Sequence, residues 1–342
     1  MPSKQGPEFL KIGYQEMKTT FREILARHGF SEQKANTCAE IFADNSLDGV
    51  YTHGVNRFPR FVKYMVDGHI RPDAEPECKS VVGCIEQWDG HLAPGPLNAL
   101  RCTDRAIEIA SIQGMGCVAL ANTNHWMRGG TYGWNAASRG FVFIAWTNTI
   151  ANMPTWGAVN GKLGNNPLVL AVPYKNDAIV LDMAMSQYSY GMLEFYKLKD
   201  QQLPVMGGFT TDGKLTTDPA SILDSQRILP IGYWKGAGLS LLLDILATIL
   251  SGGLSVAEIS KQKVEVGLSQ IFIAIALSKL HNFGTISSAV SQIINDYHSA
   301  IPDKGSSILY PGERVLNVRN ENSTNGIPVL KSVWEEIKGY RV

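Results

Sequence analysis

Residues 116–122, GCVALAN, begin a series of short runs in which nearly every residue is apolar. Further runs of this kind occur at residues 141–149 (FVFIAWTNT), 167–174 (PLVLAVPY), 178–186 (AIVLDMAMS) and 269–277 (SQIFIAIAL). Branched and aromatic residues favour strands, and strands that are apolar on both sides suit a sheet covered on both faces. The sequence therefore predicts a covered central sheet.

Segments with helical spacing of apolar residues surround these runs. They lie at residues 14–29, 31–51, 96–114, 235–253, 287–301 and 329–340. Helices at both chain ends and strands in the middle predict an α/β protein with two interleaved parts. We expect a helical domain of residues 10–115 with 290–342, and an α/β domain of residues 116–289. Residues 202–223, rich in Gly, Pro, Thr and Asp, predict either a lid-like loop or a solvated surface excursion.

The charge balance argues against several classes of partner. Among 342 residues, 31 are basic and 31 acidic, and neither sign forms a long block. Nucleic acids and anionic membrane surfaces attract basic patches, so we expect neither partner and favour a small molecule. The most apolar run, residues 239–250, is interrupted by Asp244 and is shorter than the roughly 20 residues that span a bilayer. It predicts a buried helix.

The cysteines and the opening residues indicate the compartment. The five cysteines are odd in number, and no two form a C-x-x-C pair. This pattern is typical of reduced thiols in a cytoplasmic protein. The opening residues, MPSKQGPEFLKIG, lack the apolar run of a signal peptide. We therefore expect a cytoplasmic location.

The stretch GVYTHGVNRFPRF, residues 49–61, combines a histidine with two arginines. In one continuous helix, His53, Arg57 and Arg60 would share a face, although Pro59 favours a helix that begins only there. Histidine exchanges protons near neutral pH and arginine clamps carboxylates, so the group suits reduction of an anionic carbonyl compound. Alternatively, His53 bonds backbone at a helix end and the arginines lie in solvent.

A second polar cluster, NTNHWMRGGTYGW at residues 122–134, directly follows the first apolar run. Ligands bind at the carboxyl ends of strands in open α/β folds, which makes His125 and Arg128 candidates for a site. Alternatively, the loop bends at its glycines so that Trp126 and Trp134 cover the core. Both interpretations can hold together.

Other recognisable motifs are sparse. The chain has no G-x-G-x-x-G fingerprint, and GYWKGAG at residues 232–238 is the nearest glycine-rich helix entry. Neither H-x-x-x-H, H-E-x-x-H nor D-x-D spacing occurs, so we expect no catalytic metal. A G-x-S-x-G elbow is also missing, which argues against a serine nucleophile.

These blocks, together with EQWDG at residues 86–90 and GNNPLVLAVP at 164–173, resemble the malate/L-lactate dehydrogenase family. The resemblance covers the chain from about Leu10 onward. It implies a mixed-sheet cofactor domain of the L-sulfolactate/malate dehydrogenase-like type without a Rossmann fingerprint, formed by residues 116–289. The helical domain from both chain ends would pack against it, and the enzyme would be a cytoplasmic homodimer.

The resemblance also implies an activity. The expected reaction is reduction of a sugar acid, 2,3-diketo-L-gulonate, to 3-dehydro-L-gulonate with NADH, while NADPH stays open as the cofactor. Alternative substrates for the same reaction type are malate, lactate, ureidoglycolate or a cyclic imino acid. A sugar-acid binding protein without turnover is an alternative from another class.

Site residues follow from the same resemblance. The histidine of the family's S-H-G motif, the proton donor, corresponds to His53, with Thr52 in place of the usual serine. His125 is the second candidate for this role, and Arg57 and Arg60 are candidates for holding the substrate carboxylate. The implied cofactor contacts are Thr149, Ala178, Ile179, Val180, Leu181, Asp182, Met183, Ala184, Trp234, Lys235, Gly312, Glu313 and Arg314. Relatives often carry serine at the positions of Thr149 and Ala184, and the third residue of GER departs from a frequent pattern.

Overall fold

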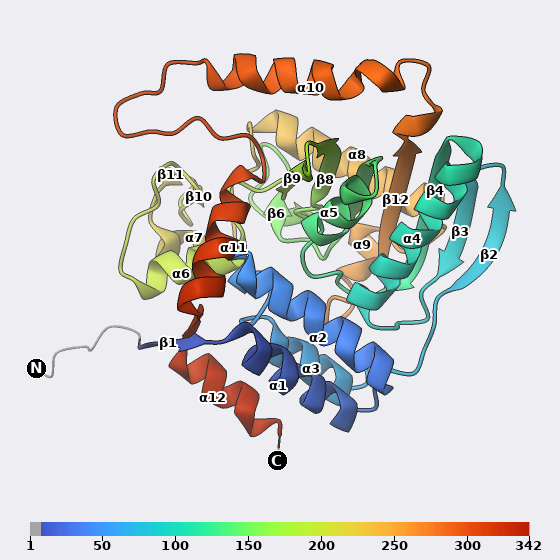
Figure 1. The fold of residues 1–342 in the computed structure, drawn as a ribbon. Helices are drawn as coiled ribbons and strands as arrows, with labels where there is room; N and C mark the ends of the chain where they lie inside the picture. The colour runs from blue at the N-terminus through green and yellow to red at the C-terminus, as the bar shows by residue number, and fades with distance from the viewer. Residues whose placement is uncertain (1–7, 342) are drawn as a thin grey trace, which may run out of the picture.

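The computed structural model describes residues 8–341 and centres on a mixed seven-stranded sheet (Figure 1). The strand order is β2-β3-β4-β12-β5-β8-β9, with β3 and β4 parallel and the other neighbours antiparallel. The strands are β2 (Glu77–Val82), β3 (Ile85–Asp89), β4 (Met115–Thr123), β12 (Leu268–Ala276), β5 (Phe141–Thr147), β8 (Leu168–Tyr174) and β9 (Asp177–Met183). Each of the five apolar runs forms one strand, so the predicted sheet is confirmed.

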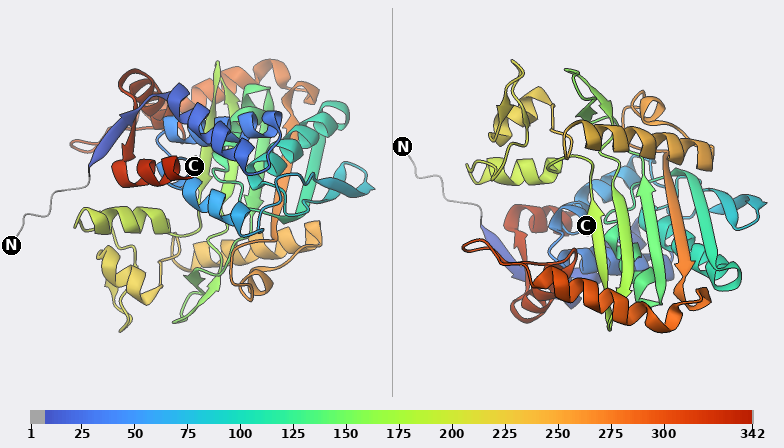
Figure 2. Two further views of the ribbon diagram at one scale, coloured as in Figure 1. Left: turned by 90° about the horizontal axis from the view of Figure 1, so that it is seen from below. Right: turned by 90° about the horizontal axis from the view of Figure 1, so that it is seen from above.

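Helices cover both faces of this sheet. Val118 and Leu120 of β4 belong to a core shared with α4 (Gly95–Gln113) and α5 (Gly130–Ser138). Cys117 and Ala119, which alternate with them, pack with α8 (Trp234–Ser251) on the other face. Figure 2 shows the helices on either side of the strands. Successive side chains of a strand point to opposite faces, which explains why nearly every residue of the run is apolar.

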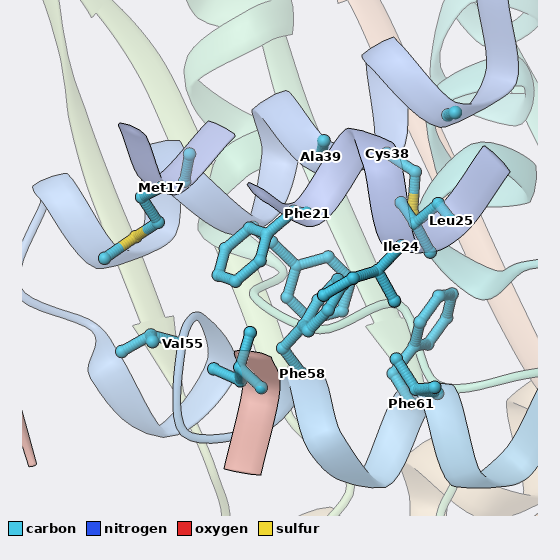
Figure 3. Packing of buried hydrophobic residues seen from close by; sticks show 14 of the residues in the cluster. Met17, Phe21, Ile24, Leu25, Cys38, Ala39, Val55, Phe58 and Phe61 are labelled. Carbon is cyan, nitrogen blue, oxygen red and sulfur yellow. The ribbon is translucent and has the colours of Figure 1, made fainter. Parts of the chain in front are cut away.

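Both chain ends close a second core beside the sheet. Its helices are α1 (Tyr14–Arg27), α2 (Glu32–Leu47), α3 (Phe58–Val66) and α12 (Lys331–Gly339). The ring of Phe21 stacks on that of Phe58 (Figure 3), with centroids 4.0 Å apart. It also meets Trp334 edge-on at 6.5 Å. Strand β1 (Phe9–Ile12) also pairs with β13 (Ile327–Leu330). The ends of the chain thus stabilise one another.

The remaining elements surround these layers. They are η1 (Tyr51–His53), β6 (Met153–Pro154), β7 (Gly161–Leu163), α6 (Tyr190–Leu198), β10 (Gly208–Phe209), β11 (Leu215–Thr216), α7 (Pro219–Ser225), α9 (Val256–Ile259), η2 (Leu277–Lys279), α10 (Phe283–His298) and α11 (Glu313–Asn325). Residues 202–223 supply β10, β11 and most of α7, and Leu203 and Ile222 share a small core with Leu193 of α6. The segment is therefore a folded surface unit with its own core.

The layout of the chain differs from the expected division at residue 115. Strands β2 and β3 and helix α4 precede that residue, yet they belong to the sheet and to the helical layer on it. Strand β2 is mostly exposed and β3 alternates between buried and partly buried residues, so neither carries a continuous apolar run. The opening residues 1–7, on which the expected absence of a signal peptide partly rests, lie outside the described residues.

Helix α8 also differs from the fully buried helix that its composition predicts. Its sheet side, including Leu243 and Ala247, is buried, but the opposite face is open. The exposed apolar side chains on that face are Leu241, Leu242, Ile245, Leu246 and Ile249. With 18 residues at a mean hydropathy of 1.3, of which 33% are buried, α8 is long and apolar enough to cross a membrane by length and composition alone. An apolar sequence predicts that a helix face is shielded from water, but it does not identify what shields that face.

Candidate active site

His53 lies in the short connection between α2 and α3. Helix α2 ends at Leu47, His53 closes the single turn of η1, and α3 begins at Phe58 with Pro59 in its first turn. The backbone is therefore not one helix from Tyr51 onward, as Pro59 indicates. Gly54 permits this tight path, because a Cβ there would lie 2.3 Å from Ser46 Oγ of α2.

The loop after β4 brings His125 against His53. The two imidazole rings stack with centroids 5.6 Å apart and planes at 19°. His125 Nδ1 accepts the Met127 backbone N–H at 2.9 Å, so Nε2 carries the proton of its neutral ring. His53 Nδ1 lies 3.2 Å from Thr52 Oγ1, so the threonine hydroxyl is within hydrogen-bond distance of the imidazole.

Both histidines are held neutral in this environment. Desolvation, with the nearby charges of Arg57 and Arg128, lowers the pKa of His53 to about 4. The pKa of His125 also lies well below its usual value, because of desolvation and the charges of Arg57 and Arg60, and a protonated His53 would lower it further. A bound anion would oppose these positive charges and raise both pKa values.

Arg57, Arg60 and His125 line one cavity. The sequence could not show that these side chains share a cavity, and it missed one more member, Glu265. The other lining residues are Phe61, Tyr64, Ile70, Asn124 and Met127. The cavity thus combines two guanidiniums, an imidazole and one carboxylate with an apolar wall.

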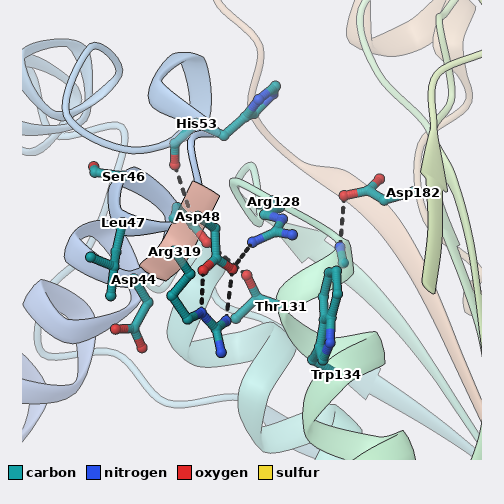
Figure 4. A network of polar contacts seen from close by, with 12 residues as sticks. Asp44, Ser46, Leu47, Asp48, His53, Arg128, Thr131, Trp134, Asp182 and Arg319 are labelled. Carbon is teal, nitrogen blue, oxygen red and sulfur yellow. Dashed lines mark hydrogen bonds and ion pairs between the residues drawn. The ribbon is translucent and has the colours of Figure 1, made fainter. Parts of the chain in front are cut away.

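Arg128, the charged residue of the second polar cluster, joins three parts of the chain (Figure 4). Asp48, directly after α2, accepts hydrogen bonds from Arg128 and from Arg319 of α11. Arg319 donates from Nε to Asp48 Oδ1 at 2.6 Å and from Nη2 to Asp48 Oδ2 at 2.9 Å. Both Asp48 and Arg128 are 5% exposed, and the Arg128 guanidinium lies 4.7 Å from the Trp134 ring centroid. This cluster fixes the loop that carries His125 against the helix that precedes His53.

The expected cofactor residues 178–183 belong to β9, the edge strand of the sheet, and Ala184 directly follows it. Asp182 Oδ2 accepts the Gly130 backbone N–H at 2.7 Å, and the Val180 N–H donates to the Pro311 carbonyl at 3.0 Å. Gly312 follows with a φ of +97°, and a Cβ there would lie 3.1 Å from Trp134 and 3.3 Å from the Val180 nitrogen. The structure thus brings residues 312–314 at the start of α11 to the edge of β9.

The other expected cofactor residues lie near the end of the same strand. Trp234 and Lys235 begin α8, and the Ile231 N–H just before them donates to the Met185 carbonyl at 2.8 Å. Thr149 Oγ1 lies 3.0 Å from Asn165 Oδ1, and the Asn165 carbonyl accepts the Met185 N–H at 2.7 Å. The starts of α8 and α11 therefore both lie beside β9 or the residues that follow it.

A model of the malate/L-lactate dehydrogenase family matches residues 12–338. The chain belongs to this family. Its sequence is 47% identical over 331 residues to 2,3-diketo-L-gulonate reductase from Citrobacter koseri, covering 96% of this chain and 99% of that relative. Sulfolactate dehydrogenase from Methanocaldococcus jannaschii has 26% identity and a TM-score of 0.87, covering 97% of this chain and 96% of its own. Malate dehydrogenase from Pyrococcus horikoshii OT3 has 25% identity and a TM-score of 0.87, covering 99% and 97%.

Membership in the malate/L-lactate dehydrogenase family makes the protein an oxidoreductase that acts on CH–OH groups and uses a nicotinamide cofactor. The expected fold is confirmed by the similar dehydrogenase structures. The residues along β9 fit such a cofactor, because α8 and α11 both start near this strand, neither start is capped by a side chain, and a helix start attracts phosphate. Gly312 keeps the edge of β9 free of a side chain at one of these helix starts.

Proposed function

We propose that the protein reduces 2,3-diketo-L-gulonate to 3-dehydro-L-gulonate with NADH. The observation that carries this proposal is the cavity lined by Arg57, Arg60 and His125, with the His53 ring stacked on that of His125, a site for an acid next to a proton donor. The 47% identity to 2,3-diketo-L-gulonate reductase supports this choice of substrate. A bound nicotinamide cofactor supplies the hydride.

The residues of the chain then position the substrate and move one proton. Arg57 and Arg60 hold the carboxylate, whose charge offsets theirs and raises the pKa of His53. His53 gives its proton to the carbonyl oxygen as negative charge develops there. His125 stacks against the donor, and it is the alternative donor because its Nε2 carries a proton. A positioned acid contributes about 10²- to 10⁴-fold in rate.

The cofactor would lie along the edge of β9. The residues that would hold it are Thr149, residues 178–184, Trp234, Lys235 and residues 312–314. Lys235 and the first N–H groups of α8 and α11 would bind its phosphates. NADH is the expected form, as the family resemblance implies, and NADPH stays open.

The protein is expected to act as a cytoplasmic homodimer. The apolar face of α8 that contains Leu242 and Ile249 is the surface that a second copy would cover, because its side chains recur at helical spacing while the opposite face packs on the sheet. Sheet packing on one side also favours a protein partner over a membrane for the other. All five cysteines are unpaired, which agrees with a reducing compartment.

The same chemistry on another 2-oxo acid is the second candidate, since the similar structures include malate and sulfolactate dehydrogenases. The test follows NADH oxidation by the purified protein with 2,3-diketo-L-gulonate, oxaloacetate, pyruvate and a cyclic imino acid. A preference in kcat/KM for the diketo acid supports the proposal, and a preference for another acid replaces the substrate. If no acid is reduced but a sugar acid still raises the melting temperature, the protein is a binder without turnover.

A further inference from the structure

Glu265 is the one acidic residue among those that line the cavity of Arg57, Arg60 and His125. It lies between α9 and β12, in a segment that the proposed mechanism does not use. Its Oε1 atom is shielded from solvent and has no hydrogen-bond partner within the described chain. A buried acceptor without a donor is unfavourable by itself, so such an atom points to a ligand that supplies the donor.

In the part of the chain that the structure describes, neither Arg57 nor Arg60 forms an ion pair with the Glu265 carboxylate. Within residues 8–341, no ion pair joins Glu265 to Arg57 or Arg60 at 4.0 Å or less. Desolvation raises the pKa of Glu265, while the charges of Arg57 and Arg60 and a hydrogen bond from the Ile150 backbone to the carboxylate oppose that shift, and Oε1 is the atom left without a donor. The arginines therefore keep their N–H groups for a substrate acid, while Glu265 keeps an acceptor for something else.

Asn124 gives the same cavity a second unused acceptor. Its amide nitrogen lies within hydrogen-bond distance of the carbonyls of His69, Leu92 and Ala93, at 3.2, 2.8 and 3.2 Å, which fixes the orientation of the amide. The remaining atom, Oδ1, is shielded from solvent and has no donor in the described chain. One wall thus offers cationic donors for a carboxylate, and Glu265 and Asn124 offer acceptors for hydroxyl groups.

We propose that Glu265, with Asn124 of the same cavity, determines specificity by accepting hydrogen bonds from hydroxyl groups on the carbon chain of the substrate. This inference rests on the proposed function and narrows it to hydroxylated 2-oxo acids. An acid with an unsubstituted chain would leave both acceptors without donors, and a site built to bond a hydroxyl rejects the analogue that lacks it. Glu265 acts on substrate choice and takes no part in proton transfer.

The test compares Glu265→Ala and Glu265→Gln with the wild type on two acids, 2,3-diketo-L-gulonate and pyruvate, with NADH. A hydrogen bond to a charged group corresponds to roughly a 10- to 100-fold change. Glu265→Ala should lower kcat/KM for the hydroxylated acid by that factor, mainly through KM, and leave the value for pyruvate unchanged or higher. Glu265→Gln, which keeps an acceptor oxygen, should recover part of the loss. Lys263→Ala, an exposed change in the same segment, is the matched control.

Competitive inhibition gives a second readout that needs no turnover of pyruvate. The inhibition constant of L-gulonate should rise about as much as KM in Glu265→Ala, while that of oxamate, which has no hydroxyl groups, should not change. If Glu265→Ala loses kcat/KM equally for 2,3-diketo-L-gulonate and pyruvate, or for neither, while the wild type is active, the role of Glu265 in specificity is overturned. A wild type that reduces none of the acids would overturn the proposed function and this inference together.

Discussion

The imidazole rings of His53 and His125 stack with their centroids 5.6 Å apart, although they come from segments on either side of β3, α4 and β4. Two protonated rings at that distance would repel by about 3 kcal/mol at an effective dielectric constant of 20. The pair therefore carries at most one positive charge near neutral pH, and the extra proton belongs to the pair as a unit. Each ring affects the acidity of the other whichever is the donor.

Replacing His53 by Asn should lower kcat/KM for the carbonyl substrate at least about 100-fold, because the positioned acid is lost. The dissociation constant of NADH, followed by its fluorescence, should change little. His125→Asn is the matched variant, and the larger loss in kcat identifies the donor. Because the rings form one unit, the double variant should lose much less than the product of the two single effects. Near-normal turnover in His53→Asn would remove it from the mechanism.

The low pKa of His53, about 4 without substrate, predicts an unusual pH profile. If the imidazolium donates the proton, the active fraction of free enzyme falls as pH rises above that pKa. The value of kcat/KM for reduction should then decrease about tenfold per pH unit between pH 5 and 8. Oxidation of the product needs the neutral ring, which is already present, so its kcat/KM should stay nearly constant over this range. A flat reductive profile between pH 5 and 7 would contradict this assignment.

Asp48→Ala should destabilise the protein by about 3–5 kcal/mol, because it leaves the buried Arg128 without its carboxylate. Asp48→Asn keeps an acceptor and should cost less. Asp104→Ala is the control, since its pair with Arg139 is 38% and 42% exposed at the two side chains and should contribute at most about 1 kcal/mol. Urea unfolding measures all three. A loss below about 1 kcal/mol for Asp48→Ala would show that Arg128 finds water or another partner.

The sequence predicts elements whose pattern is local and misses relationships between distant residues. The apolar runs identify β4, β5, β8, β9 and β12 because burial on both faces requires an unbroken run. Strand β2 escapes detection because an exposed edge strand needs no such run. Arg319 and Glu265 carry no local signal, since their importance comes from Asp48 and from the cavity, which distant parts of the chain supply.

Helix α8 shows the same limit and leads to a prediction about assembly. Its apolar composition predicts burial, yet Leu242 is 55% and Ile249 63% exposed in the single chain. We expect the wild type to be a dimer by light scattering coupled to size-exclusion chromatography. Leu242→Asp should shift it toward the monomer, because a carboxylate without a partner would be buried at the interface.

A matched variant separates this interface from general surface apolarity. Ile112 on α4 is 79% exposed, so Ile112→Asp adds the same charge at a position outside the α8 face and should leave the dimer intact. Circular dichroism spectra of both variants should match the wild type, because neither side chain is buried in the single chain. A monomeric wild type, or a Leu242→Asp variant as dimeric as the wild type at micromolar concentration, would show that a second copy does not cover this face.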